Sequence, residues 1–219
     1  MIQKNQVKFI SISDNFPPLE PSFHEQGGVC PSIKLNSTEI KLVENLITKW
    51  LSKMDFQDCV LHFEAKFNPN LLYSQNNDSF LMPIEINSRL GGCETWSNVK
   101  ASFGVDLIRE HVNLCLGFTL NLDDKKTANY RCISSNFLSK NVCFESLRIN
   151  LDKLKETKCV ELCIFKPIGE KVKLNENIGW ICVRSDFDRS ETQLISKLDK
   201  VLKNIKIEFG ENFLNEIEQ

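Results

Sequence analysis

Several features that mark particular classes of protein are scarce or missing in this sequence. The 219 residues include only 9 glycines, 7 prolines and 3 histidines. His24, His62 and His111 are too scattered along the chain to form a histidine-based metal site. No apolar run approaches the roughly 20 residues that a membrane-spanning helix needs, and no signal peptide opens the chain. We therefore expect no membrane association.

Clustered positive charge is also missing. The net charge is -2, and no basic run extends beyond a few residues. A protein that binds the phosphate backbone of nucleic acid needs a clustered positive surface. The charge pattern therefore argues against nucleic acid as the main partner.

The nine cysteines include no CxxC pair. Most of them lie among apolar residues, as in "KCVELCIF" and "GWICVRS", which favours buried, reduced thiols in a cytoplasmic protein. A zinc site that uses Cys159 and Cys163 is the alternative, although the chain lacks the paired histidine or cysteine spacing of such sites.

Apolar residues make up 42% of the chain and charged residues 26%, which is ordinary for a globular protein with a sizeable core. Residues 7–13 form a short apolar and β-branched run that predicts a strand. The pair Asn36 and Glu39 predicts a capping box at the start of a helix that extends to about residue 54.

The second half of the sequence predicts further helices and several strands. Two helices follow residue 93 and are separated at Gly104, and the second begins at Asp106 and ends at Gly117. Four strands then alternate with loops, and a helix at about 190–204 and a short strand close the chain.

Two neighbouring segments each carry polar side chains on one face. In "CVLHFEAKF" (59–67) the polar face holds His62, Glu64 and Lys66. In "FLMPIEINSR" the polar face holds Glu85 and Asn87, and the other face holds Met82, Ile84 and Ile86. Because a polar loop joins the segments, we expect an antiparallel pair with its polar faces side by side.

Oxygen atoms of Glu64, Glu85 and Asn87 would then meet at one point. Two carboxylates repel each other unless a cation lies between them, and Mg²⁺ takes such oxygen ligands. The guanidinium of Arg89 suits a phosphoryl group or a developing oxyanion. The alternative is a solvated face on which Glu64, Lys66, Glu85 and Arg89 form surface salt bridges.

These residues also carry a family resemblance. The string "LHFEAKF", a loop and "PIEINSRLGG" resemble the C-terminal half of the nucleotide-binding core of ATP-grasp carboxylate–amine ligases. The later segments "CVELCIFKPIGEKVKL" and "IGWICVRSDFDRSETQLISKLDKVLKNIKIEF" are similar to the lobe that closes these enzymes. Within the family, "PIEINSRLGGCETW" and "FHEQGGVCPS" resemble the amino-acid ligase group that includes carnosine synthase.

The resemblance implies an α+β fold in two parts. Residues 1–118 would be the C-terminal half of the nucleotide- and metal-binding domain, an antiparallel sheet with flanking helices. Residues 119–219 would be a small α+β closing subdomain. The family's glycine-rich phosphate loop is not found in these 219 residues, so an N-terminal ATP-grasp half is an expected partner and this chain alone is expected to be incomplete.

The resemblance also implies a role for individual residues. Glu64, Glu85 and Asn87 would bind the Mg²⁺ (or Mn²⁺) that bridges the ATP phosphates, and Arg89 would contact the transferring phosphate or the tetrahedral intermediate. The remaining implied contacts are Lys66 with the ATP phosphates, Ile84 with adenine, and Glu25, Gly91 and Gly92 with an amino-acid substrate. Lys66 has an open alternative, which is an ion pair with Glu85.

The implied function is an ATP- and Mg²⁺-dependent ligase. ATP would phosphorylate a carboxylate, and an amino acid's amine would attack the acyl phosphate and form a dipeptide-like amide. Several relatives carry a histidine where this chain has Gly28, which leaves the identity of the substrates open. The alternatives are a truncated, non-catalytic relative that acts as a binding or dimerisation module, and a carboxylase-type ATP-grasp reaction. Many relatives self-associate, so a homodimer is also open.

Overall fold

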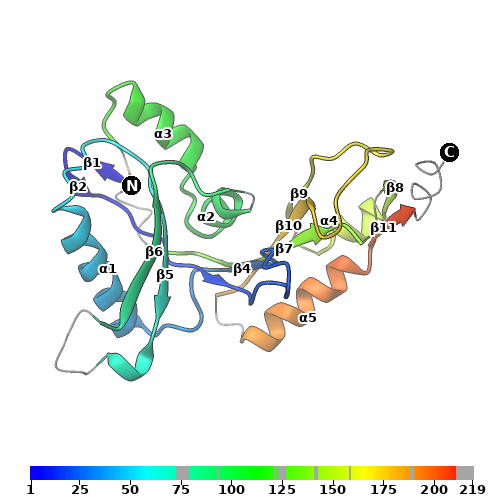
Figure 1. Ribbon diagram of the computed structural model, residues 1–219, viewed down its shortest axis with the longest axis horizontal. Helices are drawn as coiled ribbons and strands as arrows, with labels where there is room; N and C mark the ends of the chain where they lie inside the picture. Colours follow the sequence, from blue (N-terminus) through cyan, green and yellow to red (C-terminus); the bar gives the residue numbers. More distant parts are fainter. Residues whose placement is uncertain are drawn as a thin grey trace. The chain divides into compact units, whose positions relative to one another are not determined.

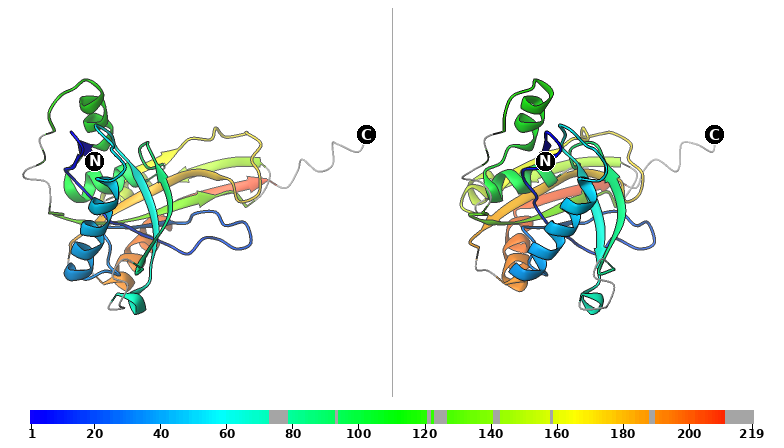
Figure 2. Two further views of the ribbon diagram at one scale, coloured as in Figure 1. Left: turned by 60° about the vertical axis from the view of Figure 1, so that its left-hand side comes forward. Right: turned by 90° about the vertical axis from the view of Figure 1, so that its left-hand side faces the viewer.

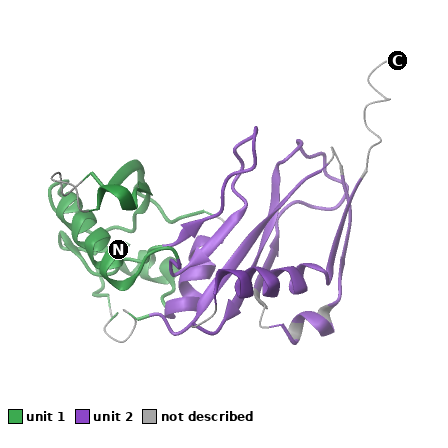
Figure 3. Cartoon of the chain, turned by 90° about the horizontal axis from the view of Figure 1, so that it is seen from below, with its two compact units in different colours: residues 1–12, 34–92, 105–127 green, residues 13–33, 93–104, 128–219 purple. Residues whose placement is uncertain are grey.

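A computed structural model of the chain describes residues 1–72, 79–92, 94–120, 122, 127–140, 143–157, 159–187 and 190–210. The chain divides into two compact units, drawn in different colours in Figure 3. Unit 1 consists of Met1–Ile12, Lys34–Gly92 and Val105–Thr127, and unit 2 consists of Ser13–Ile33, Cys93–Gly104 and Ala128–Gln219. Within the described residues, no helix is both long enough and apolar enough to cross a membrane.

Unit 1 combines two helices with two antiparallel strand pairs (Figure 1). Its elements are β1 (Ile2–Gln3), β2 (Gln6–Val7), α1 (Ser37–Leu51), β5 (His62–Phe67), the 3₁₀-helix η1 (Pro69–Leu71), β6 (Leu81–Asn87) and α3 (Leu107–Cys115). Strand β1 pairs with β2, and β5 pairs with β6. The core of the unit lies between α1 and the apolar face of β5, where Phe63 stacks on Trp50 with ring centroids 6.1 Å apart.

The predicted capping box of α1 is confirmed. The Asn36 side chain accepts hydrogen bonds from the backbone N–H groups of Thr38 and Glu39 at 2.9 and 3.0 Å. The Glu39 carboxylate in turn accepts one from the Asn36 N–H at 2.8 Å. These bonds satisfy backbone donors that a helix N-terminus otherwise leaves unpaired. From this start α1 buries Val43 and Ile47 in the core.

The strand predicted for residues 7–13 is wrong over most of its length. Only Val7 belongs to a strand, and residues 8–13 form no ladder. Phe9 is nevertheless buried, and Ile10 and Ile12 pack against the unit 1 core. The apolar run therefore reports burial correctly, but burial alone does not fix the backbone conformation.

Unit 2 is built on a five-stranded antiparallel sheet in the order β3-β4-β7-β10-β9, and Figure 2 shows its long strands side by side. Strands β11 and β8 form a separate two-stranded sheet. The elements are β3 (Asp14–Asn15), β4 (Gly27–Cys30), α2 (Thr95–Phe103), β7 (Arg131–Leu138), β8 (Cys143–Ile149), α4 (Leu151–Lys155), β9 (Cys159–Ile164), β10 (Asn177–Ser185), α5 (Glu191–Leu202) and β11 (Ile205–Gly210). The predicted α+β class, with antiparallel sheets and flanking helices, is confirmed.

The predicted breaks between the helices are also confirmed. Gly104 ends α2 with a left-handed φ of 71°, a conformation that glycine adopts without the steric cost of a Cβ atom. The Asp106 side chain then caps α3 by accepting from the Arg109 N–H at 3.2 Å. Gly117, with φ of 77°, follows the end of α3.

The two faces of the unit 2 sheet differ in chemistry. Side chains alternate along β7, so Ile133 and Phe137 lie on one face and Cys132, Ser134 and Asn136 on the other. The first face is apolar and packs on Leu194 and Leu198 of α5. The second face is polar and is covered by α2. Helices α5 and α2 therefore pack on opposite faces of the same strands.

The compact units follow a different division from the predicted domains. The prediction places one boundary between residues 118 and 119, whereas the last crossing from unit 1 to unit 2 falls between Thr127 and Ala128. The sequence prediction assigned residues 13–33 and 93–104 to the first domain, but these segments belong to unit 2. Contacts alone define these units, so the division into a nucleotide-binding domain and a closing subdomain stays a prediction.

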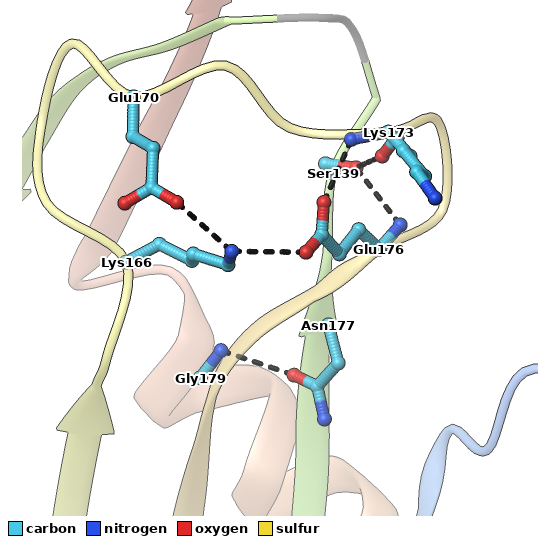
Figure 4. A network of polar contacts seen from close by, with 7 residues as sticks. All are labelled: Ser139, Lys166, Glu170, Lys173, Glu176, Asn177 and Gly179. Atoms are coloured by element: carbon cyan, nitrogen blue, oxygen red, sulfur yellow. Dashed lines mark hydrogen bonds and ion pairs between the residues drawn. The ribbon is translucent and has the colours of Figure 1, made fainter.

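A polar network holds the loop between β9 and β10 against the end of β7 (Figure 4). The Lys166 ammonium pairs with Glu170 at 2.9 Å and with Glu176 at 3.0 Å. Ser139 is 1% exposed, and its hydroxyl donates to the Lys173 carbonyl and accepts from the Glu176 N–H at 3.0 Å. One buried hydroxyl thus ties the turn that precedes β10 to the end of β7.

We predict that Ser139→Ala lowers the free energy of unfolding by about 1–2 kcal/mol, because two hydrogen bonds to a buried hydroxyl are lost. Urea denaturation measures the change. The exposed Ser196→Ala on α5 is the matched control and should leave stability within about 0.5 kcal/mol. Equal urea midpoints for Ser139→Ala and the unsubstituted protein would contradict this role.

Candidate functional site

The pairing of β5 with β6 sets two carboxylates opposite each other. Glu64 and Glu85 are cross-strand partners, and His62 and Asn87 are the next partners on the same face. Directly opposite residues have Cβ atoms about 4.5–5.5 Å apart, and like charges in that position destabilise a sheet. The four side chains therefore form one polar surface, and its two acids are unfavourable neighbours.

A register shift changes the neighbours of this surface. Glu64 pairs with Glu85, but Ala65 pairs with Pro83, so Ile84 has no partner across the ladder. The sequence places Met82 on the same face as Ile84 and Ile86, and this is wrong. Met82 pairs with Lys66 and so lies on the face of Glu64, whereas Ile86 pairs with Phe63 on the other face. An inserted residue reverses the alternation on one side of a bulge.

The shift also leaves Ile84 and Met82 outside the core. Their side chains are 55% and 56% exposed, although their residue types are apolar. Phe63, Ala65 and Phe67 on β5 pack into the unit 1 core instead. The structure therefore presents two apolar side chains to solvent on the strand that carries Glu85.

Each carboxylate of the pair has a polar partner on the same face. The His62 Nε2 lies 3.0 Å from Glu64 Oε1, and the Asn87 amide donates to Glu85 Oε1. His62 and Glu64 side chains are 24% and 30% exposed, so both remain reachable from solvent. These bonds fix the direction of the two acids without neutralising both charges.

The alternative of a solvated face is confirmed in part, because Lys66, Glu85 and Arg89 are exposed. The salt bridges that it predicts among these residues are not found in the described parts of the chain. Within the described parts of the chain, neither Lys66, Glu85 nor Arg89 takes part in an ion pair. The alternative pairing of Lys66 with Glu85 is therefore wrong for these residues. The Arg89 guanidinium lies beyond the end of β6 and donates to the Leu90 carbonyl at 2.9 Å. The positive charge of Arg89 is therefore not neutralised by an acidic side chain among the described residues.

The donor set suits a hard cation that is shared with a ligand. Glu64 and Glu85 offer carboxylate oxygens and Asn87 an amide oxygen, which are the ligand types that Mg²⁺ prefers. Among the residues that the structure describes, no group of three or more His, Cys, Asp or Glu side chains is gathered to hold a metal ion. Mg²⁺ is commonly held by one or two carboxylates, with phosphates and water as its other ligands. The residues present fit that mode of binding.

The predicted substrate residues fall in both units. Gly91 and Gly92 follow β6 in unit 1, and a Cβ atom added at Gly92 would meet no atom within 4 Å. Glu25 is an exposed residue of unit 2 whose backbone carbonyl accepts from the Asn136 amide at 3.2 Å. The structure thus places Glu64, Lys66, Ile84, Glu85, Asn87, Arg89, Gly91 and Gly92 in unit 1 and Glu25 in unit 2.

Gly28 has no room for a side chain. It lies in β4 between Asn15 and Ser134, and an added Cβ would lie 2.4 Å from the Asp14 carbonyl oxygen. The histidine that several relatives carry at this position therefore cannot be accommodated by this backbone. The close approach of the Asp14 backbone therefore explains why glycine, and not histidine, occupies this position.

The structure tests the cysteine predictions only where the cysteine side chains are described. Cys30, Cys132 and Cys182 are buried on the polar face of the unit 2 sheet and are not part of a disulfide. Cys163 is half-buried and free, whereas the Cys159 side chain lies outside what the structure describes. The zinc alternative therefore stays a prediction.

Beneath α2, the polar face of the unit 2 sheet is tied together by hydrogen bonds. The Asn98 amide donates to the Ser134 hydroxyl at 2.9 Å and accepts from the Cys182 thiol at 3.0 Å. The Ser102 hydroxyl donates to the Cys30 carbonyl at 2.9 Å. Buried polar groups usually find partners in this way. The exceptions are therefore informative.

Glu94 is such an exception, and sequence reasoning missed it. It is the N-cap residue of α2 and only 9% exposed. Its side chain makes no capping bond, and among the described residues its Oε2 has no hydrogen-bond partner. Burial raises the pKa of Glu94, against a smaller opposing effect of its backbone N–H, and the charge of Glu25 raises it further. The only sequence signal was a glutamate at a helix start directly after "LGGC".

Neither a family model nor a curated protein matches the sequence. Solved structures do match. The L-amino acid ligase of Bacillus licheniformis aligns with a TM-score of 0.76 and 16% identity over 96% of this chain and 52% of that one. The phosphoribosylglycinamide synthetase of Anaerococcus prevotii aligns with the same TM-score of 0.76 and 16% identity, over 95% of this chain and 51% of that one.

A third similar structure is the biotin carboxylase domain dimer of the Hydrogenobacter thermophilus 2-oxoglutarate carboxylase, in complex with MgADP, ADP and bicarbonate. It has a TM-score of 0.66 and 12% identity, and covers 89% of this chain and 42% of that one. These similarities confirm the ATP-grasp fold that the resemblance implied. The chain spans about half the length of the L-amino acid ligase and the phosphoribosylglycinamide synthetase that it aligns with.

We predict that Gly28→Ala destabilises the protein by about 1–3 kcal/mol, because the new methyl group must push apart the backbones of β3 and β4. Urea denaturation again measures the effect. Gly92→Ala is the control with open space and should change stability by less than about 0.5 kcal/mol. A Gly28→Ala protein as stable as this control would show that β3 is not packed as described.

The raised pKa of Glu94 predicts a pH-dependent cost in stability. Between the ordinary glutamate pKa and the raised one, the folded protein keeps a proton that the unfolded chain releases, so stability falls as pH rises through this window. Glu94→Gln removes the effect. Its gain in stability over the unsubstituted protein should therefore grow as pH rises above the ordinary glutamate pKa of about 4.3.

Urea denaturation across that pH range tests the prediction. The exposed Glu145→Gln on β8 makes the same chemical change and should track the unsubstituted protein throughout. If the curves for Glu94→Gln and Glu145→Gln run parallel at every pH, Glu94 is not the buried acid described.

Proposed function

We propose that the chain is part of an ATP- and Mg²⁺-dependent ligase that joins a carboxylate to the amine of an amino acid. The product is a dipeptide-like amide, formed through an acyl phosphate, as in the amino-acid ligase group to which carnosine synthase belongs. The observation that carries the proposal is the pair Glu64 and Glu85, held opposite each other on one face of an ATP-grasp fold.

The comparisons favour this function over a non-catalytic module. The similar structures are an amino-acid ligase, a phosphoribosylglycinamide synthetase and a carboxylase, and one of them contains MgADP. A binding module would gain nothing from two like charges directly opposite each other, because they weaken the strand pair. A pair of like charges in close proximity is typical of sites where a bound ligand neutralises the charge.

Each site residue of unit 1 has its own role in the proposed reaction. Glu64, Glu85 and Asn87 would hold Mg²⁺ (or Mn²⁺), and the metal, when bound, neutralises charge on the ATP phosphates. Arg89, which has no acidic partner among the described residues, would stabilise charge that develops on the transferring phosphoryl group. Exposed Ile84 would contact the adenine ring, and Lys66 would contact a phosphate.

The second substrate is the amino acid that supplies the amine. The family resemblance implies that Glu25, Gly91 and Gly92 would bind this substrate. The glycine-rich loop that covers the phosphates is expected from an N-terminal ATP-grasp half, so the active enzyme needs that half. A cytoplasmic location and a homodimer are further parts of the proposal.

We predict that Glu85→Gln in the intact enzyme lowers ATP turnover by at least 100-fold while the fold is kept, because one oxygen ligand of the metal loses its charge. Phosphate release, measured with saturating carboxylate and amine, reports turnover, and circular dichroism reports the fold. Glu44→Gln on α1 of the same unit is the matched control and should keep normal turnover.

Near-normal turnover by Glu85→Gln would refute the assignment. A separate titration of the 219 residues with MgATP addresses the non-catalytic alternative. The proposal expects weak or no binding to this chain and micromolar binding once the N-terminal half is added. No binding with both halves present would favour the non-catalytic alternative.

A further inference from the structure

A surface pocket of unit 2 gathers positive charge. It has a volume of about 660 Å³ and lies where the end of β8 and the start of α4 meet the end of α5 and the start of β11. Its lining holds one acidic side chain, Asp152, and four basic ones, Arg148, Lys153, Lys203 and Lys206. The whole chain has 27 basic and 29 acidic residues, so composition alone does not account for this local excess.

The backbone around the pocket is fixed by hydrogen bonds that use its two asparagines. The Asn150 N–H donates to the Asn204 carbonyl at 2.9 Å, and the Asn150 side chain accepts from the Lys153 N–H at 3.1 Å. The Asn204 amide donates to the Lys200 carbonyl at 2.9 Å. Ile149, at the end of β8, packs against the unit 2 core. The backbone of the pocket is therefore held without its basic side chains.

Two of the basic residues are unfavourable neighbours. Arg148 and Lys206 lie directly opposite each other on β8 and β11, a position in which like charges destabilise a sheet. Lys206 is partly neutralised by an ion pair with Glu208 at 2.6 Å. Among the residues that the structure describes, Arg148, Lys153 and Lys203 take part in no ion pair. Three positive charges of the pocket thus lack an acidic partner there.

A partner that matches these charges is an anion with more than one negative charge. A single carboxylate would neutralise only one of the three cations. The guanidinium of Arg148 presents a planar fork of donors that fits phosphate oxygens, and a lysine ammonium binds phosphate as a point charge. Small-molecule pockets typically have volumes of about 300–1,000 Å³, so this pocket suits a small ligand. A long polyanion is disfavoured, because the net charge of the chain is -2.

We propose that this pocket binds a small anion that carries at least two phosphate groups, with Arg148, Lys153 and Lys203 as its main contacts. All residues of the pocket lie in unit 2, and none of them is assigned to the ligase function. The pocket is therefore a binding site in addition to those of the proposed function.

Inorganic pyrophosphate is the probe, because it carries two phosphate groups and neither a base nor a sugar. Isothermal titration of the 219-residue chain in about 50 mM NaCl, without divalent cations, should show saturable binding at one site. Arg148→Gln should weaken it about fivefold or more, because the forked donor is lost. Lys140→Gln removes the same charge from an exposed position of unit 2 outside the pocket, and it should bind pyrophosphate as the unsubstituted chain does.

Two further readouts separate a binding role from a structural one. Arg148 is exposed, so Arg148→Gln should keep the melting temperature within about 2 °C of the unsubstituted chain. Pyrophosphate binding should weaken as NaCl rises to about 300 mM, because salt screens exposed charges. Should Arg148→Gln fail to fold, Lys203→Gln changes an exposed residue at the end of α5 and should still weaken binding about threefold.

The inference is overturned if the unsubstituted chain does not bind pyrophosphate, if Arg148→Gln binds it equally well, or if Lys140→Gln weakens binding as much as Arg148→Gln does. Sodium acetate at the same ionic strength should not bind, and acetate binding of equal strength would contradict the preference for phosphate. A lipid headgroup is another source of phosphate, so sedimentation with phosphatidylglycerol vesicles is the last arm. Retention on these vesicles without pyrophosphate binding would also overturn the inference.

Discussion

The backbone hydrogen bonds between β5 and β6 set the register that holds Glu64 opposite Glu85, and the candidate site depends on that register. A slip of one residue would turn one acid toward the core, where Phe63 and Ala65 pack, so the apolar face of β5 fixes the register as firmly as the ladder does. The same constraint places His62 and Asn87 beside the acids. Packing on one face of the ribbon thus positions the chemistry on the other.

Unit 2 follows the same principle with a wider sheet. Its apolar face packs on Leu194 and Leu198 of α5 and supplies the stability, which leaves the opposite face free to be polar. On that polar face Asn98, Ser102 and Ser134 are hydrogen-bonded. Among the described residues, Glu94, Asn136, Trp180 and Arg184 each keep one buried side-chain atom without a hydrogen-bond partner. In both units one face of the strands therefore packs on the core and the other carries polar side chains.

Local signals in the sequence predicted much of the fold. The capping box at Asn36, the break at Gly104 and the alternation in β5 each depend on residues that are adjacent in the chain, and each is confirmed. The strand at 7–13 failed because an apolar run reports burial and not backbone pairing. The bulge at Ile84 and the orphan carboxylate of Glu94 depend on partners that are distant in sequence, so no local pattern could reveal them.

The central claim is that Glu64 and Glu85 share one divalent cation. A crystal of the chain combined with its N-terminal half, grown with ADP and Mn²⁺, tests it by anomalous diffraction. The account predicts one strong anomalous peak about 2.1–2.3 Å from carboxylate oxygens of both residues, with a phosphate oxygen as a further ligand. A peak bound to neither carboxylate, with ADP in place, would contradict it.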